Sequence, residues 1–217
     1  MIKTIIFDLD GLLIDSEEMC YQVYVDLLAK YDKVMDLKDY AMHYSGQTAT
    51  GNMTQLIKEF DLPITMEEGL TFQKGKSKEY ISKGIDLKPG ANELLDYLKK
   101  NNYEIMLASS SNKERALTIL TNNNVVSYFD FFTYGTEVKH GKPSPDIFIK
   151  AASKSKNSKD ECLVLEDSEN GSRAAYDAGL KVICIPDMKE PSNKEMITKI
   201  LPSLKDVIKY LEDEKKM

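Results

Sequence analysis

Residues 2–11, IKTIIFDLDG, decide the fold. The first part of this stretch, 2–7, is almost entirely apolar and rich in β-branched isoleucine, which is typical of a strand buried on both faces of a sheet. The apolar run stops at Asp8, and Asp10 and Gly11 follow. Ligands bind at the carboxyl ends of strands in an open parallel sheet. The polar residues that follow this first strand are therefore candidates for a functional site.

Four more short apolar runs have the same character, and polar or turn residues follow each of them. They lie at 105–108, 131–134, 163–165 and 182–185. Helical periodicity appears between and after them, at 91–100, 113–120, 146–154, 168–178 and 204–214. Strands that alternate with helices predict an α/β fold, a doubly wound parallel sheet of Rossmann-like type with helices on both faces.

One stretch breaks this alternation. Residues 16–87 show helical periodicity and no convincing strand, and a segment of that length is too long for a simple crossover between parallel strands. The dipeptide Pro89-Gly90 marks the return to the main fold. We therefore expect 16–87 to form an inserted helical cap domain, and 1–15 together with 88–217 to form the α/β core domain.

Composition narrows the class of protein. The 217 residues are 42% hydrophobic and 29% charged, as in ordinary globular proteins. No apolar run reaches the roughly 18 residues that a membrane span needs. A net charge of −6 would repel a polyanion. We expect a cytoplasmic protein without membrane or nucleic-acid partners, and a monomer as its state.

The three cysteines, Cys20, Cys162 and Cys184, are odd in number and widely spaced. This spacing fits neither a disulfide framework nor a zinc site. Cys162 and Cys184 sit in apolar runs, so we expect both to be buried as small hydrophobic side chains.

Reactive side chains end four of the predicted strands, or lie in the loop that follows. These residues are Asp8, Asp10, Ser109, Ser110, Lys142, Glu166 and Asp167. Four carboxylates gathered at one edge of a sheet would repel one another unless a cation neutralises them. Oxygen ligands without histidine or thiol favour Mg²⁺. Lys142 and the Ser109 hydroxyl, with backbone amides after Asp8, would form a cradle for a phosphoryl group.

The spacing of the first two aspartates suggests how they share the chemistry. Asp8 and Asp10 are two residues apart, so both can flank one phosphorus atom, and Gly11 lets the backbone turn beside it. Ionised Asp8 would attack and expel an alcohol, while protonated Asp10 supplies the proton of the leaving oxygen. Asp10 would then activate water against the acyl phosphate. The sequence therefore predicts a magnesium-dependent phosphotransferase with a phospho-aspartate intermediate.

Four motifs in one order resemble those of the haloacid dehalogenase (HAD) superfamily. They are DLDG with Asp15 and Ser16, then Ser109, then Lys142 in GKPSPDIF, and Glu166-Asp167 in EDSENGSRAAYDAG. The resemblance spans nearly the whole chain. It implies that Asp8 is nucleophile and metal ligand and that Asp10 is acid/base and binds metal through its carbonyl. It further implies that Ser109, Ser110 and Lys142 bind phosphate and that Glu166 and Asp167 complete the metal site.

The helical insertion is similar to the cap of the β-phosphoglucomutase-like subgroup. Gln47 and Thr48 align roughly with a cap loop that reaches the substrate in related proteins, and we take them as candidate substrate contacts. Phosphosugar mutases of this subgroup carry a His in the first cap helix, where this chain has Cys20. They carry an Arg in the cap loop, where this chain has Ala49. Both differences favour a phosphatase over a mutase.

Three other classes share part of this chemistry. A phosphosugar mutase, such as β-phosphoglucomutase, remains the alternative. A non-enzymatic phospho-acceptor signalling domain would carry its Asp on a later strand and have no cap. A dehalogenase would not need Asp10 and Asp167. We predict a phosphatase that hydrolyses a small phosphomonoester, such as a sugar phosphate; the sequence does not specify which metabolite it uses.

Overall fold

The structure is a computed structural model that describes residues 1–45 and 47–216. The chain forms two compact units. One consists of Met1–Asp15 and Asp86–Met217, and the other of Ser16–Ile85. The return to the first unit at Asp86 lies two residues before the predicted boundary at 88. The two connections meet inside the first unit, where Ile14 bridges Leu87 and the Asp15 amide donates to the Asp86 carbonyl at 3.2 Å.

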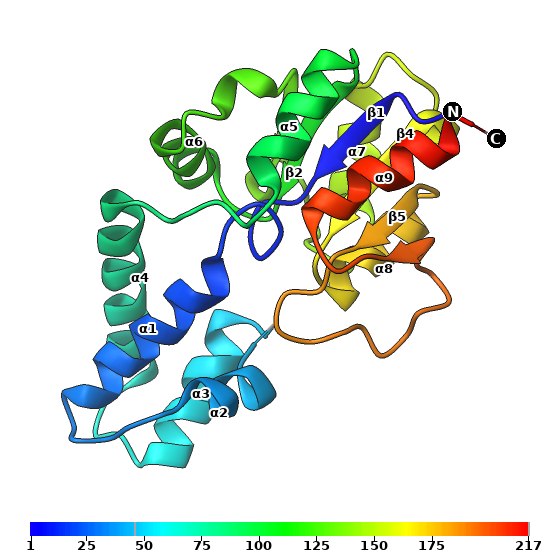
Figure 1. Cartoon of the computed structure of the whole chain (residues 1–217). Coiled ribbons are helices and arrows are strands. Elements are labelled where there is room, and N and C mark those ends of the chain that lie inside the picture. The colour runs from blue at the N-terminus through cyan, green and yellow to red at the C-terminus, as the bar shows by residue number, and fades with distance from the viewer. Residues whose placement is uncertain (46, 217) are drawn as a thin grey trace. The chain divides into compact units, whose positions relative to one another are not determined.

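The first unit is built on a parallel sheet of six strands in the order β3-β2-β1-β4-β5-β6 (Figure 1). The strands are β1 Thr4–Phe7, β2 Glu104–Ser109, β3 Phe131–Tyr134, β4 Cys162–Glu166, β5 Lys181–Cys184 and β6 Lys199–Ile200. In β1, Ile6 is paired with Met106 on one side and Val164 on the other. The α/β prediction is confirmed, and β1 lies in the middle of the sheet. The sixth strand, β6, was not predicted.

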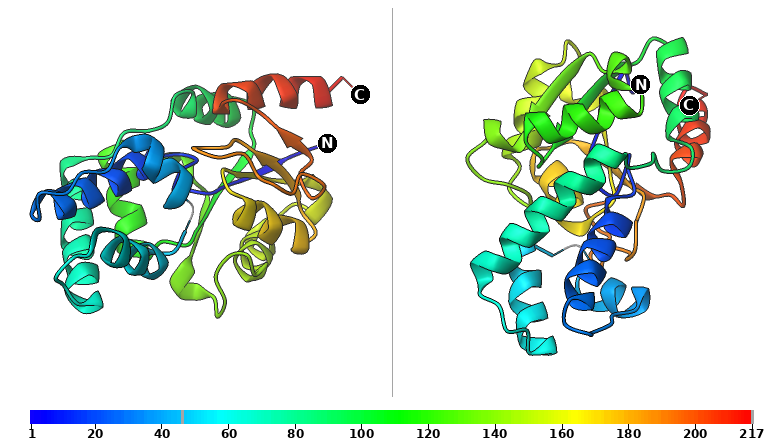
Figure 2. Two further views of the ribbon diagram at one scale, coloured as in Figure 1. Left: turned by 90° about the horizontal axis from the view of Figure 1, so that it is seen from below. Right: turned by 90° about the vertical axis from the view of Figure 1, so that its left-hand side faces the viewer.

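Helices cover both faces of this sheet. They are α5 Ala91–Lys100, α6 Lys113–Asn122, α7 Asp146–Lys154, α8 Glu169–Asp177 and α9 Leu204–Glu214, with 3₁₀ turns η1 Val126–Tyr128, η2 Gly135–Glu137 and η3 Lys159–Glu161. Figure 2 (left) shows the sheet between α5 and α9 on one side and α7 and α8 on the other.

The α7 and α8 face shows why these segments fold together. Ile6, Met106 and Val164 project from three adjacent strands into one buried cluster with Phe148 of α7 and Ala175 of α8. Side chains two apart in a strand share a face, so each buried strand supplies apolar groups to both helical layers. Burying each large side chain contributes about 1.5–3 kcal/mol. The same arrangement leaves the carboxyl ends of β1, β2 and β4 side by side.

Among the described residues of the second unit, 16–45 and 47–85, the regular elements are all helices, joined by turns and loops. Its helices are α1 Ser16–Ala29, α2 Leu37–His43, α3 Ala49–Phe60 and α4 Met66–Lys83. Side chains of Asp36, Thr48 and Thr65 cap the starts of α2, α3 and α4, which satisfies backbone amides that have no partner within the helix. Its core contains Tyr40 stacked on Tyr44, with ring centroids 6.3 Å apart.

Cys162 and Cys184 are buried in β4 and β5, as predicted, and none of the three cysteines forms a disulfide. Among the described residues, no helix combines the length and the apolar character needed to cross a membrane.

Candidate active site

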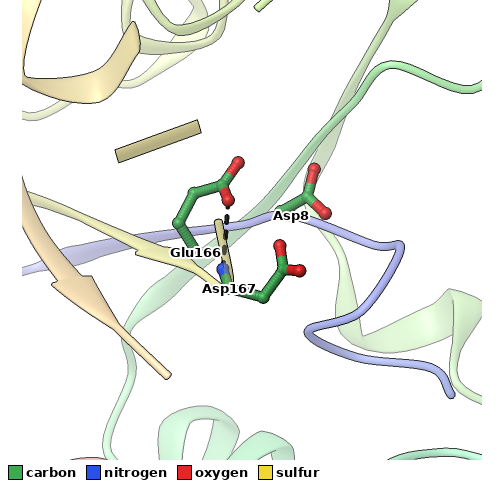
Figure 3. A group of neighbouring side chains, drawn as sticks. All are labelled: Asp8, Glu166 and Asp167. Atoms are coloured by element: carbon green, nitrogen blue, oxygen red, sulfur yellow. Dashed lines mark hydrogen bonds between the residues drawn. The ribbon is translucent and has the colours of Figure 1, made fainter. Parts of the chain in front are cut away.

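Three carboxylates converge at the carboxyl edge of the sheet (Figure 3). Asp8 follows the central strand β1, Glu166 ends the adjacent strand β4, and Asp167 comes directly after it. One carboxylate oxygen from each lies within 4.8 Å of the others. Asp8 and Glu166 are buried. The sequence prediction that separate strand ends meet here is therefore matched by the geometry of these three residues.

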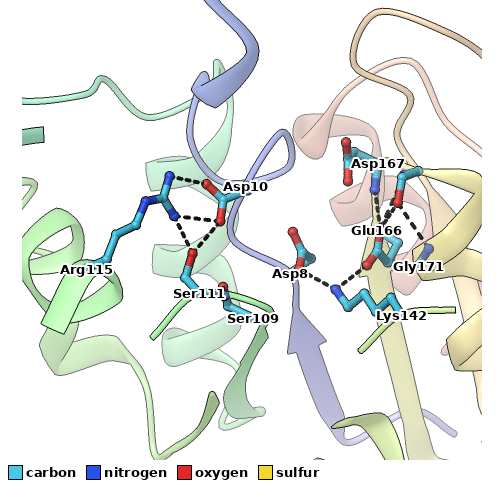
Figure 4. A network of polar contacts seen from close by, with 10 residues as sticks. Asp8, Asp10, Ser109, Ser111, Arg115, Lys142, Glu166, Asp167 and Gly171 are labelled. Atoms are coloured by element: carbon cyan, nitrogen blue, oxygen red, sulfur yellow. Dashed lines mark hydrogen bonds and ion pairs between the residues drawn. The ribbon is translucent and has the colours of Figure 1, made fainter. Parts of the chain in front are cut away.

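Lys142 supplies the positive charge of this group. Its Nζ donates to Asp8 Oδ1 and also to Glu166 Oε1, the latter at 2.5 Å. Burial alone would lower the pKa of Lys142, but the Asp8 and Glu166 carboxylates raise it above its usual range. Lys142 is therefore a fixed cation, and it links the first strand of the sheet to the fourth (Figure 4).

One lysine does not neutralise three acids. Burial, opposed by Lys142 and reinforced by Glu166 and Asp10, raises the pKa of Asp8 to about 7. Burial and the neighbouring Glu166 and Asp8 charges also raise the pKa of Asp167 well above its ordinary value. Raised carboxyl pKa values in a buried group mark a place where additional positive charge would be strongly favoured.

Glu166 is held firmly by the start of α8. Its Oε2 accepts from the Asp167 amide at 3.0 Å, the Ser168 amide at 3.2 Å and the Ser168 hydroxyl at 3.0 Å. Ser168 is also the N-cap of α8 and accepts from the Gly171 amide. A Cβ at position 171 would overlap the Glu166 carboxylate. Within the fourth motif, residues 167 and 168 thus hold the Glu166 carboxylate by hydrogen bonds, and Gly171 leaves the space that it occupies.

Asp10 points to a different partner. The Arg115 guanidinium donates to Asp10 Oδ1 at 2.6 Å and to Oδ2 at 2.8 Å, and the Ser111 hydroxyl donates to Oδ2 at 2.8 Å (Figure 4). Burial alone would raise the pKa of Asp10, but Arg115 and Ser111 hold it below its ordinary value. Both carboxylate oxygens of Asp10 therefore accept hydrogen bonds in this structure.

Sequence reasoning missed the role of Arg115. The signal was available: Arg115 lies four residues after Ser111, in the first turn of the helix that follows the second motif. The side chain of Asn112 caps that helix by accepting from the Arg115 amide at 2.9 Å. What the sequence did not reveal is the direction of the helix, which turns Arg115 toward the Asp10 that follows the neighbouring strand.

The predicted phosphate-binding serines occupy different environments. Ser109 is fully buried at the end of β2, and its Oγ accepts from the Ser111 amide at 3.0 Å. Its hydroxyl hydrogen can therefore still be donated to a ligand. Ser110 is exposed, and its backbone packs against Gly135, where a Cβ would overlap it. Phosphate binding by Ser109, Ser110 and Lys142 stays a prediction.

The candidate substrate contacts belong to the second unit. Thr48 accepts from the Gly51 amide at 3.1 Å and caps α3, and the Gln47 side chain donates to the His43 carbonyl at 2.6 Å. Both residues are exposed. Each thus has a local structural task, and a role in binding substrate stays a prediction.

The residues at this edge fit a hard divalent cation. All three clustered donors are carboxylate oxygens, and the group carries more negative than positive charge. Mg²⁺ takes one or two protein carboxylates together with water and substrate phosphate. Histidine and cysteine, which would favour a softer metal, contribute no ligand atom to this cluster.

Residues 5–185 match the family model of haloacid dehalogenase-like hydrolases. The chain belongs to this family. A probable pseudouridine-5'-phosphatase of Drosophila melanogaster is 32% identical over 210 residues, which cover 93% of this chain and 89% of that protein. A phosphorylated carbohydrates phosphatase of Thermotoga maritima is 27% identical, with 83% of each chain covered. The predicted HAD superfamily membership is confirmed, and the chain is a phosphatase of that family.

The solved structures agree on the fold of this HAD hydrolase. A putative β-phosphoglucomutase from Thermotoga maritima superposes with a TM-score of 0.81 at 23% identity, covering 98% of this chain and 99% of the other. At that identity the likeness establishes the shared fold, including a helical insertion of the β-phosphoglucomutase-like type, and leaves the reaction to be argued from the site.

Proposed function

We propose that this HAD phosphatase hydrolyses small phosphomonoesters of the sugar-phosphate type in a magnesium-dependent reaction through a phosphorylated Asp8. Support for the substrate class comes from relatives named for pseudouridine 5'-phosphate and for phosphorylated carbohydrates. In both names the phosphate ester is that of a small polar metabolite with an alcohol as leaving group.

The observation that carries the proposal is the bridge made by Lys142. Its ammonium joins Asp8 to Glu166 in a buried site beside Asp167. Such a group is costly for a folded protein to maintain. It would be well suited to a ligand that carries its own negative charge together with a divalent cation.

In the proposed reaction, Asp8 attacks the phosphorus of the ester. The phosphorus–oxygen bond to the alcohol breaks, and the alcohol oxygen takes a proton from Asp10. Asp10 then removes a proton from water, whose oxygen attacks the phosphorus of the phospho-aspartate. Inorganic phosphate leaves and the Asp8 carboxylate is restored. Lys142 and the Ser109 hydroxyl would hold the phosphoryl oxygens during both steps.

The Asp8 and Asp167 carboxylates and the Asp10 carbonyl would hold Mg²⁺. Glu166, the remaining acid of the cluster, would lie beside the cation. Because both Glu166 oxygens already accept hydrogen bonds, we assign Glu166 chiefly to fixing Lys142 and the Asp167 loop. When bound, the cation supplies positive charge that offsets the carboxylates and the phosphate dianion. The protein's part is to keep this arrangement dry and fixed.

We also propose that the helical unit acts as a cap that selects the substrate, with Gln47 and Thr48 among its contacts. A cytoplasmic monomer without nucleic-acid or membrane partners is the setting we propose, and the net charge of −6 supports the lack of affinity for polyanions. Small-angle scattering with and without a phosphate analogue tests the cap, because substrate closure should make the particle more compact.

The decisive assay is phosphate release from a panel of small phosphomonoesters, with Mg²⁺ and with chelator. β-Glucose 1-phosphate with a trace of the 1,6-bisphosphate is tested in parallel. Magnesium-dependent release of free phosphate is the expected result. Formation of glucose 6-phosphate with little free phosphate would instead establish a mutase and contradict our interpretation of Cys20 and Ala49.

A further inference from the structure

Asp187 lies at the carboxyl edge of the sheet but has no part in the reaction as written above. It comes three residues after β5, which is the neighbour of β4 on the side away from β1. The Ile185 amide continues this pairing, because it donates to the Glu166 carbonyl at 2.7 Å. Asp187 therefore follows the strand beside Glu166 and Asp167, at the edge where a parallel sheet binds its ligands.

One carboxylate oxygen of Asp187 is buried without a partner. The Asp187 side chain is only 9% exposed, and its Oδ2 accepts no hydrogen bond from any residue that the structure describes. An unpaired buried oxygen is costly, and nearly all buried polar atoms in proteins have a partner. Such an oxygen at this edge of the sheet indicates a donor that belongs to a ligand or to the water around it.

Gly11 shows where this oxygen lies. A Cβ at Gly11 would overlap Asp167 Oδ2 and would be 3.3 Å from Asp187 Oδ2. Oxygens of both acids thus approach the same point beside the Gly11 backbone. Gly11 directly follows Asp10, whose carbonyl is a proposed ligand of Mg²⁺. Asp187 Oδ2 is therefore close to the proposed metal site.

The other oxygen of Asp187 is held by Lys88. The Lys88 ammonium donates to Asp187 Oδ1 and lies 3.7 Å from Asp15 Oδ1. The Lys88 amide donates to the Leu13 carbonyl at 2.8 Å, and the Lys88 side chain is only 20% exposed. This anchored cation fixes one oxygen of Asp187 and leaves the other directed toward Gly11.

The chemistry of Mg²⁺ indicates what Asp187 Oδ2 would accept. Among the described residues, the acids whose oxygens cluster within 4.8 Å of one another are Asp8, Glu166 and Asp167, so Asp187 lies outside the ligand cluster. Mg²⁺ loses its water reluctantly and keeps several water molecules when a protein binds it. Hydrogen bonds made just outside the ligands hold a metal site in its geometry.

We propose that Asp187 is a positioning residue of the metal site. Its Oδ2 accepts a hydrogen bond from a water molecule in the hydration shell of Mg²⁺, while Lys88 fixes its Oδ1. The inference rests on the proposed magnesium-dependent function. It adds a residue from the end of the fifth strand to a site whose other members come from the four sequence motifs.

The test measures metal binding without turnover. The rise in unfolding temperature over a series of Mg²⁺ or Ca²⁺ concentrations gives an apparent affinity for each ion. We compare wild type, Asp187→Asn and Lys88→Gln. Glu190→Gln is the matched control, because Glu190 belongs to the same loop and pairs with Lys194 but is 63% exposed. Unfolding in chelator verifies that each variant is folded.

Loss of the acceptor should weaken Mg²⁺ binding by about tenfold to a hundredfold in Asp187→Asn, as is typical when a partner just outside the metal ligands is removed. Lys88→Gln keeps the acid but not the cation that fixes it, so it should give a smaller loss, and Glu190→Gln none. The affinity for Ca²⁺, which depends less on retained water, should fall less than that for Mg²⁺.

Two results overturn the inference and leave the phosphatase intact. Unchanged Mg²⁺ affinity in Asp187→Asn would mean that Oδ2 binds only a structural water. An equal loss for Mg²⁺ and Ca²⁺ would mean that the substitution displaces the ligands themselves. Wild-type protein that binds no Mg²⁺ and releases phosphate in chelator refutes the magnesium-dependent function and this inference together.

Discussion

Gly171 lies directly against the carboxylate of Glu166. A Cβ at position 171 would overlap the carboxylate carbon and both of its oxygens. The glycine lies in the first turn of α8 and its amide donates to Ser168, so its place is fixed by the helix cap. The Glu166 carboxylate therefore fits only because position 171, in the first turn of α8, has no side chain.

Gly171→Ala should displace Glu166 and, through it, Lys142 and Asp167. We expect a loss of stability of about 1–3 kcal/mol from overpacking, together with weaker Mg²⁺ binding measured by calorimetry. Gly75→Ala is the control, since a Cβ at that helical position meets no atom within 4 Å; it should leave stability equal or raise it by up to about 1 kcal/mol. Equal effects of the two substitutions would show that Gly171 has no special role.

Asp8→Asn should abolish turnover and preserve the fold. The amide is nearly the same size as the carboxylate but lacks its nucleophilic charge, so kcat should fall by about a thousandfold or more. Single-turnover phosphate release and far-ultraviolet circular dichroism measure the two properties. A variant that keeps a substantial rate would remove Asp8 from the role of nucleophile.

Lys142→Met should destabilise the metal-free protein near neutral pH. The substitution leaves Asp8 and Glu166 buried without their cation, and removal of one partner of a buried ion pair costs about 3–5 kcal/mol. Urea unfolding in the presence of chelator measures the loss. Lys150→Met is the matched control, because Lys150 is 38% exposed and lies 3.4 Å from Glu137; it should cost less than about 1 kcal/mol. Similar losses in both variants would argue against an essential bridge.

The raised pKa of Asp8 predicts how stability depends on pH. Its folded pKa of about 7 lies above the ordinary value of 3.8, so the protonated form is the one that folding favours. The stabilisation is complete below the ordinary value and is lost as pH rises through the folded pKa. Metal-free wild type should therefore lose stability relative to Asp8→Asn as the pH rises from about 4 to about 7. A difference that does not change with pH, measured by urea unfolding with chelator, would contradict this assignment.

The sequence predicted the bounds of several helices and of one strand in the first unit correctly. The segments predicted at 91–100, 146–154 and 204–214 coincide with α5, α7 and α9, and 131–134 with β3. Periodicity was informative for the three helices because each of them buries one apolar face. Strand β6 has two residues, exposed or half-buried, and so short a stretch has no detectable pattern.

The site was predicted in part for a related reason. Residues that end adjacent strands must meet, so Asp8, Glu166 and Asp167 could be brought together before any coordinates were known. The partner of Asp10 depends instead on the rotation of α6 about its own axis. That rotation depends on how the buried side chains Ala116, Ile119 and Leu120 pack. A single sequence does not reveal this packing, and Arg115 was missed for that reason.

The two crossings between the units have a consequence for how such a protein diversifies. The chain leaves the core at Asp15 and returns at Asp86, and these residues are hydrogen-bonded to each other. The segment between them could be replaced by another insertion. The two ends of the remaining core already lie in contact, and the register of its strands would not change. Under the proposed division of roles, the first unit carries the reaction and the second chooses the metabolite. Selection could then change what the enzyme recognises without altering how it cleaves.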